Sequence, residues 1–246
     1  MSESRKKLVN LRTNLLLTRP EDDSINLSKS FDKSKFNIYI SPLIQIIKSN
    51  YKFNKKHSYD FIIFTSKNGI LNFKHFKKDD KIIVIGDGTY LLAKKLGIRN
   101  ILNVRGNSTD LKKKIKPLLR KGLSFIHPTS KDLNKDLMNF FSENGCNYKP
   151  IDCYLSKANN SYPEIFENFF HTCEYGLVTL FSKRTAYSFK NEVLKLDLSG
   201  SCKKKKILVL SKMIGEELTG MGLENILITE EPNEKSMIDL IMKISQ

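Results

Sequence analysis

The chain has 246 residues, enough for one large domain or two small ones, each able to bury its own core. Its net charge of +16 comes mainly from lysines spread over every segment, a pattern typical of solvated helix faces, and arginines that could read bases are few. Four scattered cysteines and four scattered histidines lack metal-ligand spacing, and no run reaches the ~20 apolar residues of a membrane span. We therefore expect a soluble, cytoplasmic protein with no metal, no disulfide framework, no membrane segment and no nucleic-acid partner.

Short apolar runs recur along the chain, and each is followed by small polar residues and then by a helical pattern. Such βα units are typical of a parallel sheet flanked by helices, whose strands are apolar throughout because both faces are buried. In chain order, we predict strands at residues 14–17, 61–64, 82–85, 101–104, 123–126, 176–180, 207–210 and 226–228.

The sequence also repeats itself. Residues 60–69 match 175–184 in their strand, serine-lysine turn and following helix, and residues 96–102 match 221–227 with Gly97 and Gly222 at equivalent places. Self-similarity of this kind predicts two similar α/β domains, and a two-lobed molecule has a cleft where its lobes face each other. Three further matches join 81–86 with 206–211, 107–111 with 232–236, and 15–31 with 124–141.

Two segments are expected to connect the lobes. Residues 36–43 and 150–155 each place a proline, Pro42 or Pro150, beside apolar residues with an extended pattern. Proline fixes the φ angle, which suits a strand-like tether.

Polar loops follow most of the predicted strands. Ligands of parallel α/β sheets bind beyond the carboxyl ends of the strands, where hydroxyls, exposed backbone N–H groups and helix dipoles attract anions. The serines and threonines could instead be ordinary helix N-caps, but the accompanying cations, with Lys131 among them, favour a carboxylate or phosphate receptor. The candidate binding residues are Thr18, Arg19, Thr65, Ser66, Lys67, Asn68, Gly86, Gly88, Thr89, Ser130, Ser182, Lys183, Arg184, Ser211 and Lys212.

Common nucleotide and nucleophile motifs are missing from the sequence. Gly86-Asp-Gly-Thr begins like a dinucleotide fingerprint, but Leu91 stands where its third glycine belongs. Neither a phosphate-binding G-x-x-x-x-G-K-[ST] loop nor a G-x-S-x-G elbow occurs. Standard nucleotide-driven and nucleophilic chemistry is therefore not expected.

Tyr154 lies on the second predicted tether, from which it could point into the cleft. Its phenol could donate or accept a proton there. It could equally be an aromatic side chain packed on a strand, and its spacing favours neither role.

The order of motifs resembles that of the uroporphyrinogen-III synthase family from about residue 14 to residue 244. The matching segments are Leu17-Thr-Arg-Pro, Ser41-Pro-Leu, Ile63-Phe-Thr-Ser-Lys-Asn-Gly-Ile, Val84-Ile-Gly-Asp-Gly-Thr, Cys153-Tyr, Phe181-Ser and Gly222. The resemblance implies a discontinuous α/β domain of residues 1–36 plus 155–246, an inserted α/β domain of residues 37–154, a two-strand hinge, and an active-site cleft between the domains.

The same resemblance implies an activity and a catalytic residue. A monomeric lyase would cyclise hydroxymethylbilane to uroporphyrinogen III with inversion of ring D and loss of water, in haem biosynthesis and without a cofactor. Tyr154 would assist the loss of the hydroxyl, and the substrate's carboxylates would suit the predicted anion receptor. Ser211-Lys-Met-Ile and Thr129-Ser-Lys-Asp depart from the family pattern. A two-lobed tetrapyrrole- or polyanion-binding protein without turnover is therefore the alternative, and nucleic-acid binding through the lysines is a third possibility.

Overall fold

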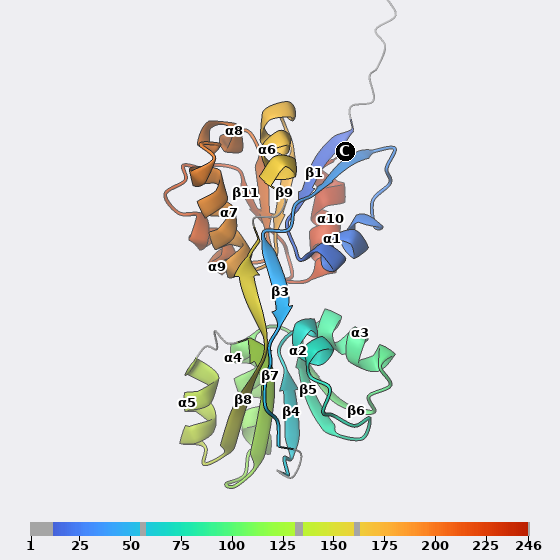
Figure 1. The fold of residues 1–246 in the computed structure, drawn as a ribbon, viewed down its shortest axis with the longest axis vertical. Helices are drawn as coiled ribbons and strands as arrows, with labels where there is room; N and C mark the ends of the chain where they lie inside the picture. Colours follow the sequence, from blue (N-terminus) through green and yellow to red (C-terminus); the bar gives the residue numbers. More distant parts are fainter. Residues whose placement is uncertain (1–11, 55–57, 131–134, 160–162, 246) are drawn as a thin grey trace, which may run out of the picture. The chain divides into compact units, whose positions relative to one another are not determined.

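The computed structural model describes residues 12–54, 58–130, 135–159 and 163–245, and the chain divides into two compact units. Unit 1 comprises Met1–Gln45 with Ala158–Gln246, and unit 2 comprises Ile46–Lys157. In each unit, helices lie on both faces of a sheet (Figure 1). The predicted fold class of α/β units with parallel sheets flanked by helices is confirmed. Within the described ranges, no helix is both long and apolar enough to cross a membrane.

Unit 1 contains a five-stranded sheet with the order β11-β10-β9-β1-β2, in which every neighbouring pair is parallel. The elements of this unit are β1 (Thr13–Leu17), α1 (Glu21–Ser28), β2 (Phe36–Ile40), α6 (Pro163–Thr172), β9 (Leu177–Leu180), α7 (Lys183–Lys195), α8 (Ser199–Lys203), β10 (Lys206–Val209), α9 (Lys212–Gly215), η2 (Glu216–Leu218), β11 (Ile226–Ile228) and α10 (Glu234–Ile244).

Unit 2 is built around a six-stranded sheet with the order β3-β8-β7-β4-β5-β6. The strands from β8 to β6 are parallel. The elements are β3 (Ile44–Lys48), β4 (Phe61–Phe64), α2 (Lys67–Asn72), β5 (Lys81–Ile85), α3 (Asp87–Lys95), β6 (Asn100–Val104), α4 (Ser108–Ile115), η1 (Lys116–Leu118), β7 (Ser124–Ser130), α5 (Lys135–Glu143) and β8 (Asn147–Ala158).

The two sheets repeat one strand order. From its β11 edge, the sheet of unit 1 has the order β11-β10-β9-β1-β2. From its β6 edge, the sheet of unit 2 has the order β6-β5-β4-β7-β8, and the strands correspond in that order. The register agrees as well, because Ile82 pairs with Ile101 as Ile207 pairs with Ile226, each partner being shifted by 125 positions (207 − 82 and 226 − 101). The sequence repeats therefore correspond to repeated structure.

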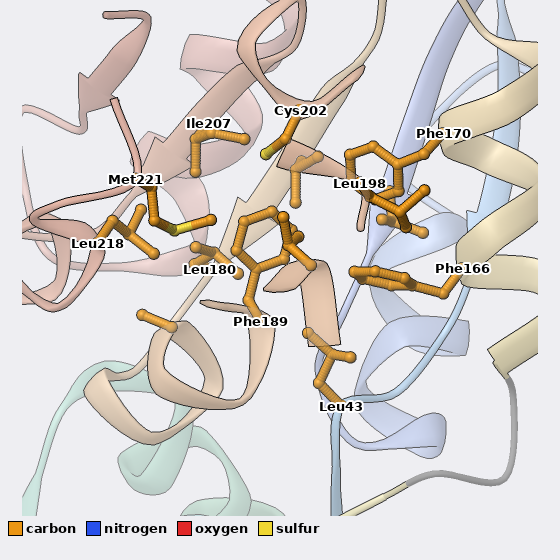
Figure 2. Packing of buried hydrophobic residues seen from close by; sticks show 14 of the residues in the cluster. Leu43, Phe166, Phe170, Leu180, Phe189, Leu198, Cys202, Ile207, Leu218 and Met221 are labelled. Atoms are coloured by element: carbon orange, nitrogen blue, oxygen red, sulfur yellow. The ribbon is translucent and has the colours of Figure 1, made fainter. Parts of the chain in front are cut away.

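The sheet of unit 1 buries side chains on both faces, which explains its uninterrupted apolar runs. Leu16 contributes to a core under α6 and α7, whereas its neighbours Leu15 and Leu17 contribute to a second core under α1 and α10. Figure 2 shows the first core, where Phe166 and Phe170 from α6 pack against Phe189 from α7.

Unit 2 follows the same rule. Ile62 and Phe64 belong to a core that includes Ala93 of α3, whereas Ile63 belongs to a core that includes Leu111 of α4 and residues of α5. At roughly 25 cal/mol per Å² of apolar surface, burial of this kind is the main stabilising contribution in either unit.

The tethers differ from those expected from the sequence. Residues 36–43, interpreted as a tether, contain β2, which pairs with β1 along its whole length, so a division after residue 36 would remove a strand from its sheet. The chain leaves unit 1 in β3 and returns in β8. Hydrogen bonds from Asn159 N–H to the Leu43 carbonyl and from Ser49 N–H to the Cys153 carbonyl show that these two strands run antiparallel. Residues 150–155 form only the middle of β8, which also pairs with β7.

Candidate functional site

Because the strands of each sheet other than β3 are parallel, their carboxyl ends lie along one edge, and the loops that follow them gather there. In unit 2 this edge carries the loops after β4, β5 and β7. In unit 1 it carries the loops after β1, β9 and β10. All fifteen candidate binding residues are described, and each lies at one of these two edges, while Lys131 lies outside the described residues.

The loop after β4 brings Ser66 to Tyr154. Ser66 is the N-cap of α2 and accepts a hydrogen bond from Gly69 N–H, and its Oγ lies 2.9 Å from the phenol oxygen of Tyr154. Tyr154 is on β8, only 7% exposed, and opposite Ser130 in the register, next to an irregularity in β7. The structure therefore brings together Ser66, Ser130 and Tyr154, which are far apart in the sequence.

Gly69 allows this arrangement by its lack of a side chain. A Cβ atom at this position would lie 2.6 Å from the carbonyl oxygen of Pro128 on β7. The start of α2 can approach β7 this closely only with glycine. Gly69 thus places the Ser66 turn beside the strand that neighbours β8.

Behind this turn lies His127, which sequence reasoning did not identify. His127 is 2% exposed on β7, its Nε2 lies 2.9 Å from Thr65 Oγ1, and its Nδ1 lies 2.5 Å from the phenol oxygen of Tyr148. Burial lowers the pKa of His127 to about 4 and raises the pKa of Tyr148 above its usual range. Both side chains are therefore neutral at pH 7. The only signal in the sequence was a polar residue within an otherwise buried strand.

The loop after β5 adds a glycine-rich helix start. Gly86, with φ +81°, is the N-cap of α3, and its N–H donates to the Val104 carbonyl. Gly88 is exposed in the first turn, whereas Thr89 is buried. The Cδ of Lys67 would lie 3.9 Å from a Cβ at Gly88, so the Lys67 stem reaches this loop. Asn68, one position after Lys67, is partly buried, and its carbonyl accepts from the Asn72 amide.

A hollow of about 510 Å³ lies farther along the same edge of unit 2. The Asn103 Nδ2 donates to Asp87, while its Oδ1 is buried and is without a hydrogen-bond partner within the described part of the chain. The hollow carries both charges, because Arg105 and Lys114 line it together with Asp110.

In unit 1, the loop after β1 uses its polar groups internally. Thr18 is fully buried and its hydroxyl donates to the Thr179 carbonyl at 2.6 Å. Arg19 forms ion pairs with Asp23 of α1 and Glu234 of α10, and its guanidinium lies 4.4 Å from the centre of the Phe181 ring. This arginine ties two helices to the end of the sheet, and its charge is balanced by two carboxylates.

The two other loops of unit 1 resemble the Ser66 turn in part. Ser182 is the N-cap of α7, has φ −154° and ψ 156° where Ser66 has −155° and 158°, and accepts from Thr185 N–H. Lys183 is exposed and lies 3.4 Å from Glu217, and Arg184 is partly buried. Ser211 is the N-cap of the short α9 without a side-chain cap bond, and Lys212 beside it is exposed.

Thiol and metal chemistry find little support in the described residues. The four cysteines are free and buried, and burial raises the pKa of Cys153, next to Tyr154, to about 12, so its thiol stays protonated. No three His, Cys, Asp or Glu side chains of the described ranges gather as metal ligands.

Comparisons with known proteins agree with this architecture. The sequence model described as uroporphyrinogen-III synthase HemD matches residues 26–239. The uroporphyrinogen-III synthetase of Helicobacter pylori has the same fold, with TM-score 0.65 and 14% identity over 95% of this chain and 100% of that one. A mutant uroporphyrinogen III synthase of the extremely thermophilic bacterium Thermus thermophilus has TM-score 0.55 and 14% identity over 94% and 98%. No curated protein matches the sequence significantly.

Proposed function

We propose that this chain, which belongs to the uroporphyrinogen-III synthase family, converts hydroxymethylbilane to uroporphyrinogen III. The family match spans most of the chain and places the protein in tetrapyrrole and haem biosynthesis. In the proposed reaction, the C–O bond of the hydroxymethyl group breaks, the hydroxyl leaves as water, and the linear tetrapyrrole closes with ring D inverted. The family match is the observation that carries this proposal.

The arrangement in unit 2 supports a role for Tyr154 in the loss of water. A hydroxyl leaves easily only when it receives a proton, and a phenol can supply one. The Ser66 hydroxyl, itself held by Gly69 N–H, lies 2.9 Å from the Tyr154 oxygen and can orient the phenol, or relay to it a proton taken up from solvent. We therefore assign Tyr154 as the proton donor and Ser66 as its orienting partner.

Binding of the substrate's carboxylates would fall to the helix starts at the sheet edges. Backbone N–H groups at the first turns of α2, α3 and α7 carry the positive ends of their helix dipoles. Lys67, Lys183, Arg184 and Lys212 would add positive charge, and Thr65, Asn68, Gly86, Gly88, Thr89, Ser130, Ser182 and Ser211 would contribute hydroxyls or accessible backbone. Because the geometry relies on several groups, positioning would supply much of the rate enhancement.

The isomer of the product tests the proposal. The spontaneous cyclisation of hydroxymethylbilane gives uroporphyrinogen I, so the purified protein should shift the product to the III isomer. Oxidation of the products to porphyrins and separation of the isomers by chromatography measures the ratio. A product that contains the I isomer alone at any enzyme concentration would exclude the activity.

A binding protein without turnover is the second candidate. It is favoured by the loop after β1, where Thr18 is buried and Arg19 is paired with two carboxylates, so this loop presents little free polar surface. Such a protein should bind a tetrapyrrole with eight carboxylates, for which uroporphyrin is a stable probe, yet leave the isomer ratio unchanged.

We further propose that the enzyme is a monomeric, cofactor-independent hydro-lyase of the cytoplasm. The active-site cleft would lie between the two units, as the family resemblance implies. Sedimentation analysis of the purified protein tests the oligomeric state, and full activity after dialysis against a chelator tests the independence from metals.

A further inference from the structure

Three side chains form a row in unit 2, with the buried His127 at its centre, that the proposed reaction does not by itself require. The Tyr148 phenol oxygen lies 2.5 Å from His127 Nδ1, and His127 Nε2 lies 2.9 Å from Thr65 Oγ1. The row runs from β8 through β7 to the end of β4, across three neighbouring strands. It ends one residue before Ser66, whose hydroxyl contacts Tyr154.

Packing fixes the far end of this row. The Tyr148 ring is stacked on Phe141 of α5, with centroids 4.8 Å apart and an interplanar angle of 8°. Phe141 is itself fully buried in a core of unit 2. The phenol of Tyr148 therefore has a defined direction, toward Nδ1 of His127.

The distances indicate where the protons lie. A neutral imidazole carries one N–H, so one of its nitrogens donates and the other accepts. The 2.5 Å contact is short for an N–H donor and lies within the range of O–H donors, whereas the 2.9 Å contact is typical of N–H···O. These distances favour the arrangement in which Tyr148 donates to Nδ1 and Nε2–H donates to Thr65. With its oxygen accepting from His127, Thr65 can direct its own proton away from the ring.

We propose that His127, oriented by Tyr148, is a positioning residue that holds the Thr65 hydroxyl as an outward hydrogen-bond donor to a substrate carboxylate. A hydroxyl that accepts a hydrogen bond from the ring must point its own hydrogen away from it, so that hydrogen is available to donate to an anionic ligand. Thr65, the residue that follows β4, is only partly buried. This role rests on the proposed function for its ligand and deepens it.

The tautomer can be measured without any substrate. In ¹⁵N-histidine-labelled protein at pH 7, the His127 signals, assigned by their loss in His127→Gln, should show an unprotonated Nδ1 and a protonated Nε2. In Tyr148→Phe, the proton should redistribute between the two nitrogens. A protonated Nδ1 in the unmodified protein would overturn the proposal, whether or not the protein is an enzyme.

Steady-state kinetics with hydroxymethylbilane tests the second half of the proposal. Thr65→Val, which keeps the shape and removes the hydroxyl, should lower kcat/KM by about 10- to 100-fold, the effect of one hydrogen bond to a charged group. The loss should lie mainly in KM, because a carboxylate that takes no part in the bond changes is held equally strongly in the ground and transition states. Thr65→Ser should retain most of the affinity. A loss confined to kcat would contradict the assignment.

A double-mutant cycle separates positioning from folding. Tyr148→Phe should lower kcat/KM by about 3- to 10-fold in the unmodified protein and have no further effect in Thr65→Val, because the row then has no hydroxyl to orient. Additive losses would reject the coupling. Tyr59→Phe is the matched control: its phenol in the same unit donates to Asp80 at 2.9 Å, away from Thr65, and its removal should leave KM unchanged.

If the protein binds a tetrapyrrole without converting it, the same variants test the role of Thr65 through their affinity for uroporphyrin. Thr65→Val should then weaken binding by about 10-fold or more, and Tyr148→Phe should again have no effect in that background. Unchanged binding in Thr65→Val would exclude Thr65 as a carboxylate ligand. The isomer assay and the row of hydrogen bonds can thus fail independently.

Discussion

The Ser66 hydroxyl performs two tasks, since it accepts a hydrogen bond from Gly69 N–H at the start of α2 and lies 2.9 Å from the Tyr154 phenol oxygen. A helix cap and a candidate proton donor are thereby joined through one oxygen atom. Any substitution that moves the cap should also affect the phenol.

Replacing Tyr154 by phenylalanine tests its chemical role. We expect Tyr154→Phe to lower kcat by about 100-fold, the lower end of what a positioned general acid contributes, with a small change in KM. Rapid-quench or continuous assays with hydroxymethylbilane measure both constants. An unchanged kcat would assign Tyr154 to packing, a role that its 7% exposure also allows.

Ser66→Ala should combine two effects that a control can separate. Loss of the cap should reduce the free energy of unfolding by about 1 kcal/mol, and loss of the partner of Tyr154 should reduce kcat. Asn107→Ala removes the N-cap of α4 in the same unit, where Asn107 accepts from Thr109 and Asp110 N–H groups. This control should lose similar stability in urea denaturation and retain kcat. Equal kcat values for the two variants would argue against a role for Ser66 in catalysis.

The buried His127 should make the protein sensitive to acid. In the folded state its pKa is about 4, against 6.5 in an exposed chain. Between these values the unfolded chain binds a proton that the folded protein does not, so stability falls as the pH falls, by about 3 kcal/mol at pH 4 relative to pH 7. Well above pH 7, the ring is neutral in both states and the effect is absent.

His127→Gln isolates this contribution from that of the carboxyl groups. The variant lacks the titrating ring, so the difference in unfolding free energy between the original protein and the variant should shrink by about 3 kcal/mol from pH 7 to pH 4. Urea denaturation at several pH values in this range measures it. A difference that stays constant with pH would mean that His127 is protonated in the folded protein.

Lys205 is a buried lysine whose ammonium group has a structural task. Its Nζ donates to the carbonyl oxygens of Cys173 and Glu174 just after α6, and the residue is 1% exposed. Lys205→Met should leave these carbonyls without their donor and cost about 2 kcal/mol of unfolding free energy. The neighbouring Lys206 is exposed, and Lys206→Met should change stability by less than about 0.5 kcal/mol. Equal effects would refute the assignment.

Asp197 adopts a conformation that favours glycine. Its φ is +53°, and it follows α7 as Gly97, with φ +78°, follows α3. Asp197→Gly should therefore stabilise the protein by about 1 kcal/mol, and Gly97→Asp should destabilise it by a similar amount. Thermal unfolding measures both, and a lower Tm for Asp197→Gly would show that the aspartate side chain contributes more than the strain costs.

Much of the fold could be predicted because its strands are short, apolar and buried on both faces. All eight predicted strands correspond to strands of the structure. The sequence repeats correspond to strands paired in the same register, since Ile82 pairs with Ile101 as Ile207 pairs with Ile226. Of the three other described strands, β2 and β8 overlap the segments 36–43 and 150–155 that were expected only as strand-like tethers, and β3 was not predicted. The weak signals of β2 and β3 have a physical reason. In Phe36–Ile40 polar residues interrupt the apolar pattern at a sheet edge, and Ile44–Lys48 is half exposed. Edge strands carry a weaker signal than central ones.

The candidate site could be predicted only in part. The serine-lysine turns indicated helix starts, and Ser66 and Ser182 are both N-caps. The sequence could not reveal that Tyr154 lies beside Ser66, since that contact depends on the placement of β8 two strands away from β4. Nor could it reveal that Arg19 is paired with Glu234, which is 215 positions away along the chain.

The shared strand order has a consequence for how the chain folds during synthesis. All strands of unit 2 are available once residue 158 has been made, so this unit can fold while the rest is still being translated. β1, made first, pairs with β9, which ends at Leu180, and the sheet is completed only by β11. Unit 2 can therefore be folded before unit 1, whose strands β1 and β2 cannot join their complete sheet until most of the polypeptide has been made.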